Sequence, residues 1–262
     1  MRKRIDYDER QYAVYAQARA MSPATLATWV RTFARHAGPR RPLAVLDLGS
    51  GTGRLTPALA EEFGGPVYGV EPSNRMRAVA EETAGHPQVT YLAGAADRIP
   101  LPDGCCDLVL MFLVLHHVSD KAAAVEEVVR VLRAGGRLLI HSTLADRIPE
   151  MTWHRFFPRA REIEARIFPT LDEVVGMCRA AGLEYLAMER IRLRMAGSLA
   201  EYAGRLRLRG ISTFEYLSDE ETAAGFAALD AAVAAEITPQ PVEGDCDLLV
   251  LGHDGTVSTG RG

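Results

Sequence analysis

The nine residues VLDLGSGTG at positions 45–53 decide the fold of this chain. A short, continuously apolar run is typical of a buried parallel strand, and the run from Leu43 to Leu48 leads directly into three glycines at alternate positions. Glycine lets a backbone turn tightly and lets a ligand approach it closely. The apolar positions that follow, from Leu55 to Phe63, indicate a helix. A strand, a glycine loop and a helix in this order predict a ligand site at the carboxyl end of the strand.

The spacing of the glycines argues against two kinds of nucleotide loop. A dinucleotide fold requires G-x-G-x-x-G, and Arg54 stands where its third glycine would fall. A P-loop requires Gly-Lys-Ser/Thr, which this stretch lacks. An NAD-dependent oxidoreductase is therefore disfavoured, and a plain tight turn is the structural alternative.

Strands and helices go on alternating as far as residue 141. We expect four further strands at residues 67–70, 89–93, 107–112 and 137–141, and two more at 183–192 and 246–252. Helices beginning at Ser73 and Asp120 separate some of them. Each connection is long enough for a right-handed crossover. The pattern predicts an α/β fold with a doubly wound, mostly parallel, seven-stranded sheet.

Three regions do not fit this alternation. Residues 1–42 are expected to form an N-terminal helical cap, with helices over residues 7–20 and between Ser22 and Gly38. Within the remaining domain, residues 43–262, insertions are expected at about 144–169 and 194–245, where helical patterns predominate.

The composition is that of an ordinary soluble globular protein. The chain has 262 residues, a net charge of −4 and 48% hydrophobic residues. The start has no apolar core typical of a secretory signal, and no run approaches the ~18 apolar residues of a membrane span. Four scattered cysteines without a CxxC pair predict neither a disulfide framework nor a metal site. We expect a cytoplasmic protein with no membrane or nucleic-acid partner.

Glu71 closes the second expected strand, VYGVE at positions 67–71. A carboxylate in this position can accept two hydrogen bonds from a ribose diol. The structural alternative is a solvated acid at the start of a helix. Its place one strand after the glycine loop favours the ribose role.

These segments together resemble the class I S-adenosylmethionine (SAM)-dependent methyltransferases of the small-molecule type. The resemblance runs from residue 43 to about 141 and includes VLDLGSGTG, YGVEPS at 68–73, LAGAADRIPLPDGCCDLV at 92–109, LHHV at 115–118 and EVVRVLRAGG at 127–136. It implies a Rossmann-like sheet with helical lid insertions, SAM as cofactor, S-adenosylhomocysteine (SAH) as product, and in-line methyl transfer to a small-molecule acceptor. The insertions would then enclose the acceptor.

The resemblance also implies a set of cofactor-binding residues: Tyr15, Arg19, Asp47, Gly49, Ser50, Gly51, Gly53, Glu71, Pro72, Met76, Ala95, Ala96, Asp97, Phe112 and Leu113. Tyr15 and Arg19 lie four residues apart and so share a helix face. One position departs from the family pattern, because Ala95 stands where relatives usually carry an Asp for the adenine amino group. Either Asp97 takes over that contact or the backbone at Ala95 and Ala96 holds the ring.

Histidines are the candidate general bases, since an unperturbed imidazole can accept a proton at neutral pH. His116 and His117 follow the fourth strand and His141 ends the fifth. Packing is the alternative for all three. Trp153, His154 and Phe157, together with Tyr202, are candidates for an apolar acceptor pocket, with a lid that packs on the core as the alternative.

Six arginines in the second insertion and the strand before it read as solvated surface: Arg190, Arg192, Arg194, Arg205, Arg207 and Arg209. The alternative is that one or two hold an acidic acceptor or a phosphate. Rival functions are an RNA or protein methyltransferase and a non-catalytic SAM-binding module. We expect a monomer or a homodimer.

Overall fold

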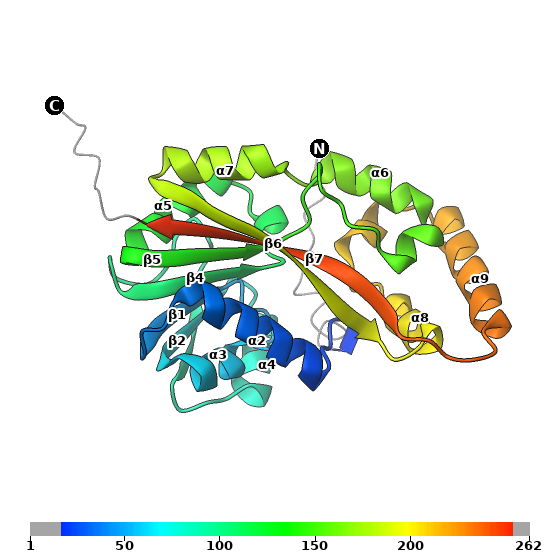
Figure 1. Ribbon diagram of the computed structural model, residues 1–262, viewed down its shortest axis with the longest axis horizontal. Coiled ribbons are helices and arrows are strands. Elements are labelled where there is room, and N and C mark those ends of the chain that lie inside the picture. The colour runs from blue at the N-terminus through cyan, green and yellow to red at the C-terminus, as the bar shows by residue number, and fades with distance from the viewer. Residues whose placement is uncertain (1–16, 254–262) are drawn as a thin grey trace.

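The computed structural model describes residues 17–253, which form a seven-stranded mixed sheet flanked by helices (Figure 1). The strand order is β3-β2-β1-β4-β5-β7-β6. The bounds of the strands are β1 Leu43–Leu48, β2 Gly64–Glu71, β3 Val89–Ala93, β4 Cys106–Phe112, β5 Leu132–His141, β6 Leu183–Ala196 and β7 Val242–His253. The first five pair in parallel, whereas β7 is antiparallel to both β5 and β6. The predicted doubly wound, mostly parallel sheet is confirmed.

The two faces of the sheet are covered by different helices. Helices α2 (Pro23–Ala37) and α3 (Thr56–Phe63) pack on one face, where Trp29, Phe33 and Leu59 meet the side chains of β1 and β4. Helices α5 (Lys121–Val131) and α7 (Leu171–Ala180) pack on the other, and α4 (Asn74–Thr83) lies against β2 and β3. Every residue of β1 and β4 is buried, as expected for central strands covered on both sides.

Helix ends follow the local signals in the sequence. Ser22 and Ser73 cap α2 and α4 by accepting hydrogen bonds from backbone N–H groups. Thr170 and Glu173 form the predicted capping box of α7. The helix expected over residues 7–20 falls mostly outside the described residues.

A lid extends beyond the carboxyl edge of the sheet, at the right of Figure 1. It consists of η3 (Thr152–Arg155), α6 (Pro158–Ile167), α8 (Leu199–Arg207), η4 (Ser212–Tyr216) and α9 (Asp219–Ala235). These elements share an apolar core of their own, which includes Trp153, Phe157 and Phe214. The short η2 (Leu115–His117) follows β4 on the sheet side.

Strands β6 and β7 are longer than the predicted 183–192 and 246–252, since β6 continues to Ala196 and β7 already begins at Val242. Beyond the sheet they pair only with each other, from Ile191↔Cys246 to Ala196↔Val242. This two-stranded ribbon carries the second insertion, which therefore begins after Ala196 and ends before Val242.

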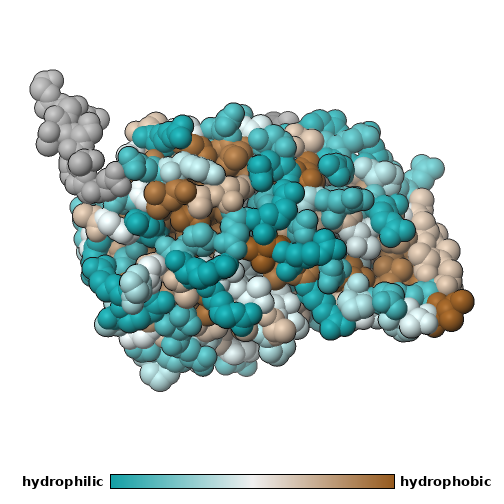
Figure 2. Space-filling view, in the orientation of Figure 1, coloured by the Kyte–Doolittle hydropathy of each residue, from teal (hydrophilic) through white to brown (hydrophobic). Residues whose placement is uncertain are grey.

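The outer surface in the view of Figure 2 is mostly hydrophilic, with apolar side chains gathered in small patches. Tyr185, Leu186 and Ile237 are the large apolar residues exposed within the described chain. No helix in residues 17–253 is both long enough and apolar enough to cross a bilayer.

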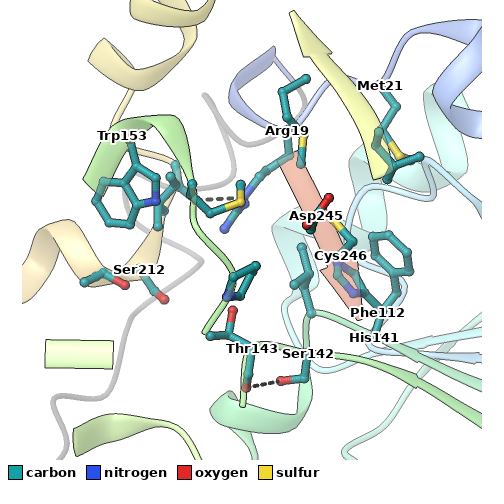
Figure 3. Close-up of a pocket in the computed structure, with 18 of the residues that line it drawn as sticks. Arg19, Met21, Phe112, His141, Ser142, Thr143, Trp153, Ser212, Asp245 and Cys246 are labelled. Atoms are coloured by element: carbon teal, nitrogen blue, oxygen red, sulfur yellow. Dashed lines mark hydrogen bonds between the residues drawn. The ribbon is translucent and has the colours of Figure 1, made fainter. Parts of the chain in front are cut away.

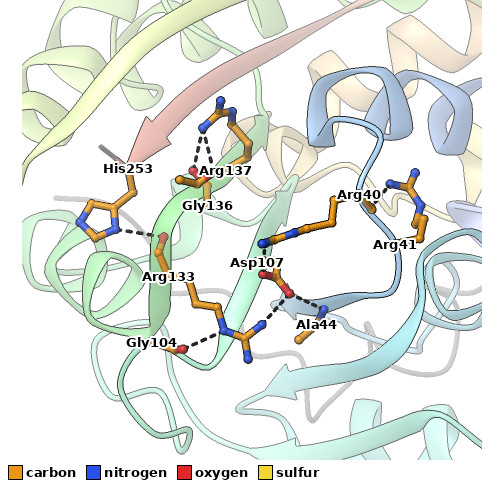
Figure 4. Close-up of polar contacts among 10 residues, drawn as sticks. Arg40, Arg41, Ala44, Gly104, Asp107, Arg133, Gly136, Arg137 and His253 are labelled. Carbon is orange, nitrogen blue, oxygen red and sulfur yellow. Dashed lines mark hydrogen bonds and ion pairs between the residues drawn. The ribbon is translucent and has the colours of Figure 1, made fainter. Parts of the chain in front are cut away.

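The amino ends of the central strands are tied together by a buried carboxylate (Figure 4). Asp107 of β4 accepts hydrogen bonds from Arg40 at 2.5 Å, from Arg133 at 2.7 Å and from the backbone N–H of Ala44 at 2.8 Å. This network lies at the end of the sheet opposite the glycine loop and anchors β1 to β4.

Candidate active site

The glycine loop after β1 is packed too tightly for side chains at two of its positions. Gly49 has φ +78°, a conformation that favours glycine, and a Cβ there would lie 2.4 Å from Val114 Cγ2. A Cβ on Gly53 would lie 2.3 Å from the hydroxyl of Tyr91. The N–H of Gly49 donates to Val70 O at 2.8 Å. The loop is thus fixed against the carboxyl end of β2.

Glu71, at the end of β2, lies directly beside this loop. One carboxylate oxygen accepts a hydrogen bond from the N–H of Gly51 and the other from the N–H of Ser73, both at 2.9 Å. Burial raises the pKa of Glu71, while the two backbone hydrogen bonds oppose the rise. The structure therefore brings together the acid and the glycines that the sequence separates.

Asp47, near the end of β1, links this strand to the start of α3 on the other side of the glycine loop. Its side chain is 2% exposed and accepts a hydrogen bond from Thr56 Oγ1 at 2.7 Å. Burial raises its pKa to about 6. Ser50 is buried too, and its hydroxyl has no hydrogen-bond partner among the described residues.

The remaining cofactor candidates lie around the same edge. Pro72 is exposed and Met76 is buried in the first turn of α4. Ala95, Ala96 and Asp97 form the turn after β3, closed by the Ala95–Arg98 bridge, and Asp97 is exposed. Tyr15 lies outside the described residues.

A cavity of about 220 Å³ separates this edge of the sheet from the lid (Figure 3). Trp153 and Ser212 of the lid lie on one side, and Phe112, His141 and Cys246 lie on the other. Arg19 also lines it and donates from Nε to Gly210 O at 3.0 Å. Apolar side chains dominate the walls, and include Met21, Trp29, Leu113, Leu144, Met151, Phe168 and Leu206.

Leu113 stands at the boundary between this cavity and the loop edge. It follows β4 with φ +59°, a left-handed conformation rare for a residue with a side chain. Its N–H donates to His141 O at 2.8 Å. Backbone strain of this kind concentrates at functional sites.

His141 is the best-defined polar group on the sheet side of the cavity. Its Nδ1 lies 2.8 Å from the backbone oxygen of Asp247. Because a carbonyl only accepts, Nδ1 carries the proton and the lone pair resides on Nε2. The ring packs between Trp29 and Phe112, with centroid distances of 4.6 Å to each. Burial lowers the pKa of His141 to about 4, so the ring is neutral at physiological pH.

The other two candidate histidines form a pair in η2. Their ring centroids lie 3.9 Å apart. His116 lines the cavity and meets the ring of Phe168 edge-on at 4.9 Å. His117 is half-buried behind it.

The four predicted acceptor-pocket residues separate into two groups. Trp153, His154 and Tyr202 line the cavity, and burial raises the pKa of Tyr202 to about 12. Phe157 lies inside the lid core instead, where its ring meets Phe214 and the Cα of Gly225.

Three of the six arginines pair with acidic side chains, of which Asp247 is buried. Arg190 forms a bidentate pair with Asp247, at 2.8 and 2.9 Å. Arg192 pairs with Glu243, and Arg207 pairs with Asp230. Arg194 and Arg205 contribute to the cavity wall. Arg54, Glu164 and Asp247 also line the cavity, and no motif or spacing marks them as site residues.

Comparison with known proteins finds similarity to methyltransferases over part of the chain. Residues 46–140 match the family model of the methyltransferase domain. An uncharacterised methyltransferase of Mycobacterium tuberculosis is 45% identical over 111 residues, which is 42% of this chain and 44% of that protein. The demethylmenaquinone methyltransferase of Beutenbergia cavernae is 38% identical over 112 residues, 43% of this chain and 45% of that protein. The match spans less than half the length of these curated relatives.

Solved structures resemble the chain over most of its length. A candidate methyltransferase from an antibiotic biosynthesis pathway of Anabaena variabilis has a TM-score of 0.69 and 24% identity, covering 87% of this chain and 99% of its own. The [4+2]-cyclase SpnF has a TM-score of 0.60 and 20% identity, covering 90% and 84%. These likenesses show the fold.

Proposed function

We propose that this chain, which carries a methyltransferase domain of the class I SAM-dependent family over residues 46–140, transfers the methyl group of SAM to a small-molecule acceptor. One observation carries the proposal: Glu71 and the glycine loop lie in contact at the edge of the sheet, and a mainly apolar cavity lined by Arg54, the residue after the loop, lies between that edge and the lid. A cofactor site and an acceptor site therefore adjoin each other.

The residues at the loop edge fit SAM. Glu71 uses one lone pair of each carboxylate oxygen for backbone N–H groups, which leaves a second lone pair on each for the two ribose hydroxyls. Met76 and Pro72 border the adenosine side, with the Ala95–Asp97 turn beyond them. Asp97 is exposed and able to take the adenine contact that Ala95 cannot make. Arg19 and, from the undescribed segment, Tyr15 are proposed for the methionine end.

SAM, when bound, supplies a methyl group on a positively charged sulfur. Because that leaving group departs readily, the protein contributes mainly alignment, which can be worth up to ~7–11 kcal/mol. Phe112 and Leu113 line the cavity, and we assign them the contact with the methyl-bearing end of the cofactor.

We assign His141 as the group that accepts a proton from the acceptor. Its Nδ1–H is fixed by Asp247 O, so Nε2 presents a lone pair. Burial lowers the pKa of His141 to about 4, so the ring is neutral and its Nε2 lone pair is free to accept a proton. His116 is the second candidate because it also lines the cavity, and His117 is the third.

An apolar acceptor suits the cavity walls. Two of the relatives are named as methyltransferases of demethylmenaquinone and of ubiquinone or menaquinone biosynthesis, and a planar, largely apolar ring is the acceptor class that we propose here. The proposed setting is the cytoplasm, and all four cysteines are free thiols.

Calorimetric titration with SAM, SAH and NADH tests the proposal. Micromolar binding of SAM and SAH, with no binding of NADH, is expected. SAH release during incubation with a panel of quinols and phenols then tests catalysis. Binding of NADH alone would overturn the proposal, and SAM binding without turnover of any acceptor would favour a binding module or, as in SpnF, another chemistry on the same fold.

A further inference from the structure

A buried polar cluster forms part of the lid wall of the cavity. Glu164 of α6 lies 3.0 Å from His154 Nε2 through one carboxylate oxygen, and the other accepts a hydrogen bond from Thr213 Oγ1 at 3.1 Å. The three residues come from η3, α6 and η4, and all three are at least nine-tenths buried. We call them the Glu164 cluster. All three line the cavity.

The hydrogen bonds of His154 define the charge of the Glu164 cluster. Its Nδ1 is buried and has no hydrogen-bond partner among the described residues. A doubly protonated ring would leave a buried N–H there without an acceptor, which is costly. A neutral ring that donates from Nε2 leaves only a lone pair unsatisfied. The geometry therefore favours a neutral His154 beside the Glu164 carboxylate.

Among the described residues, the negative charge of Glu164 is not balanced by an ion pair with an arginine or a lysine. His154 is its one ionisable partner within residues 17–253. Burying a carboxylate is expensive unless it is paired and fully hydrogen-bonded. Two of its roughly four lone-pair positions are used by neutral donors, which leaves capacity for further donors.

The surroundings indicate where the missing donor would come from. Trp153 and Ile211 next to the cluster are apolar, while Ser212 places a hydroxyl on the same wall (Figure 3). His141 lies across the cavity, at the end of β5. A molecule in this cavity thus meets a hydrogen-bond acceptor on the lid side and another on the sheet side. The walls between them are mainly apolar and also carry charged side chains such as Arg19 and Arg205.

We propose that Glu164 binds a hydrogen-bond-donating group, an amine or a hydroxyl, at the end of the acceptor remote from the methylated atom. This inference rests on the proposed function, since it takes the cavity to be the acceptor site. It makes the acceptor a molecule with an apolar body and two polar ends. His154 and Thr213 act as positioning residues that hold the carboxylate.

Three fragments of matched shape test the proposal: benzylamine, benzyl alcohol and toluene. Their dissociation constants are measured by ligand-observed NMR on the protein saturated with SAH. The amine or the alcohol is expected to bind at least tenfold tighter than toluene, and the order of these two reports whether a cationic or a neutral donor is preferred. Toluene binding as tightly as both, or no binding of any fragment, would overturn the proposal.

The matched variants are Glu164→Gln and Glu162→Gln. Glu162 lies on the same helix with a side chain 65% exposed, so its variant is expected to leave all three constants unchanged. In Glu164→Gln the advantage of the amine over toluene should fall at least fivefold. An unchanged advantage would contradict the assignment.

Thr213→Val covers the case in which Glu164→Gln does not fold. This variant removes one internal donor to Glu164 and keeps the carboxylate. The preference for benzylamine over toluene should therefore equal or exceed that of the wild type. A weaker preference counts against the proposal. SAH binding, measured first on each sample, separates a failure of this inference from a failure of the proposed function. If SAH does not bind, the fragments are titrated into the protein alone and judged by the same criteria.

Discussion

His141 and Asp47 are buried groups whose pKa values are displaced in opposite directions. Burial lowers the pKa of His141 from 6.5 to about 4 and raises that of Asp47 from 3.8 to about 6. Between these values the unfolded chain binds a proton at His141 that the folded protein does not, so His141 makes stability rise with pH. Asp47 does the reverse, because the folded protein holds the proton that the unfolded chain has released.

Each residue changes the free energy of unfolding by about 1.4 kcal/mol per pH unit where the folded and unfolded states differ by one bound proton. From pH 4.5 to 6 this gives about 2 kcal/mol for each residue, with opposite signs. The two effects nearly cancel in the wild type. Single variants separate them, and His141→Asn is suitable because its amide nitrogen can replace Nδ1 as donor to Asp247 O.

The assay is urea unfolding of the wild type, His141→Asn and Asp47→Asn at several pH values between 4.5 and 6.5. The free energy of unfolding of the wild type minus that of His141→Asn should increase by about 2 kcal/mol as the pH rises from 4.5 to 6. The same difference for Asp47→Asn should decrease by a similar amount. Cavity and packing effects of the substitutions shift the differences equally at every pH. Differences that do not vary with pH would refute the burial-based account of both residues.

Three further outcomes are expected. Glu71→Gln should weaken SAM binding by about 2–3 kcal/mol, or about 30- to 150-fold, because charge-assisted hydrogen bonds are lost. Calorimetry gives the Kd, with Glu82→Gln as the control variant, and a Kd of Glu71→Gln within twofold of the wild type would contradict the ribose role. Gly49→Ala should abolish measurable SAM binding, because its Cβ would lie 2.4 Å from Val114 Cγ2 at φ +78°, and retained binding would show that the loop can relax. Asp107→Ala should lower the free energy of unfolding by about 2–4 kcal/mol, since the buried N–H of Ala44 loses its acceptor and two ion pairs are lost. An unchanged urea midpoint would mean that the network does not contribute to the stability of the fold.

The sheet and the cofactor edge were predictable because their signals are local. A buried strand such as Leu43–Leu48 is read from a continuous apolar run, and the position of Glu71 follows from the parallel order of β1 and β2. The start of α7 was also predictable, since its capping box lies within four residues.

The acceptor side was less predictable because its contacts are long-range. The partner of His141 is the backbone of Asp247, 106 positions away, and no spacing rule links them. On α6 the sequence PRAREIEARI does not distinguish buried Glu164 from exposed Glu162. Phe157 and Trp153 both read as aromatic pocket residues, but only the packing of the lid decides that Trp153 faces the cavity.

The ribbon formed by β6 and β7 gives one part of the lid, consisting of α8, η4 and α9, a separable attachment. Ala196 and Val242 are paired across the ribbon, so residues 197–241 leave and rejoin the sheet at adjacent points. Segments joined in this way can be exchanged with little disturbance to the host domain. Transplanting the corresponding segment of another methyltransferase between these two residues would change the acceptor wall while β5, β7 and the glycine loop stay in place. The chain thus has a natural junction at which the proposed methyl transfer could be combined with different acceptors.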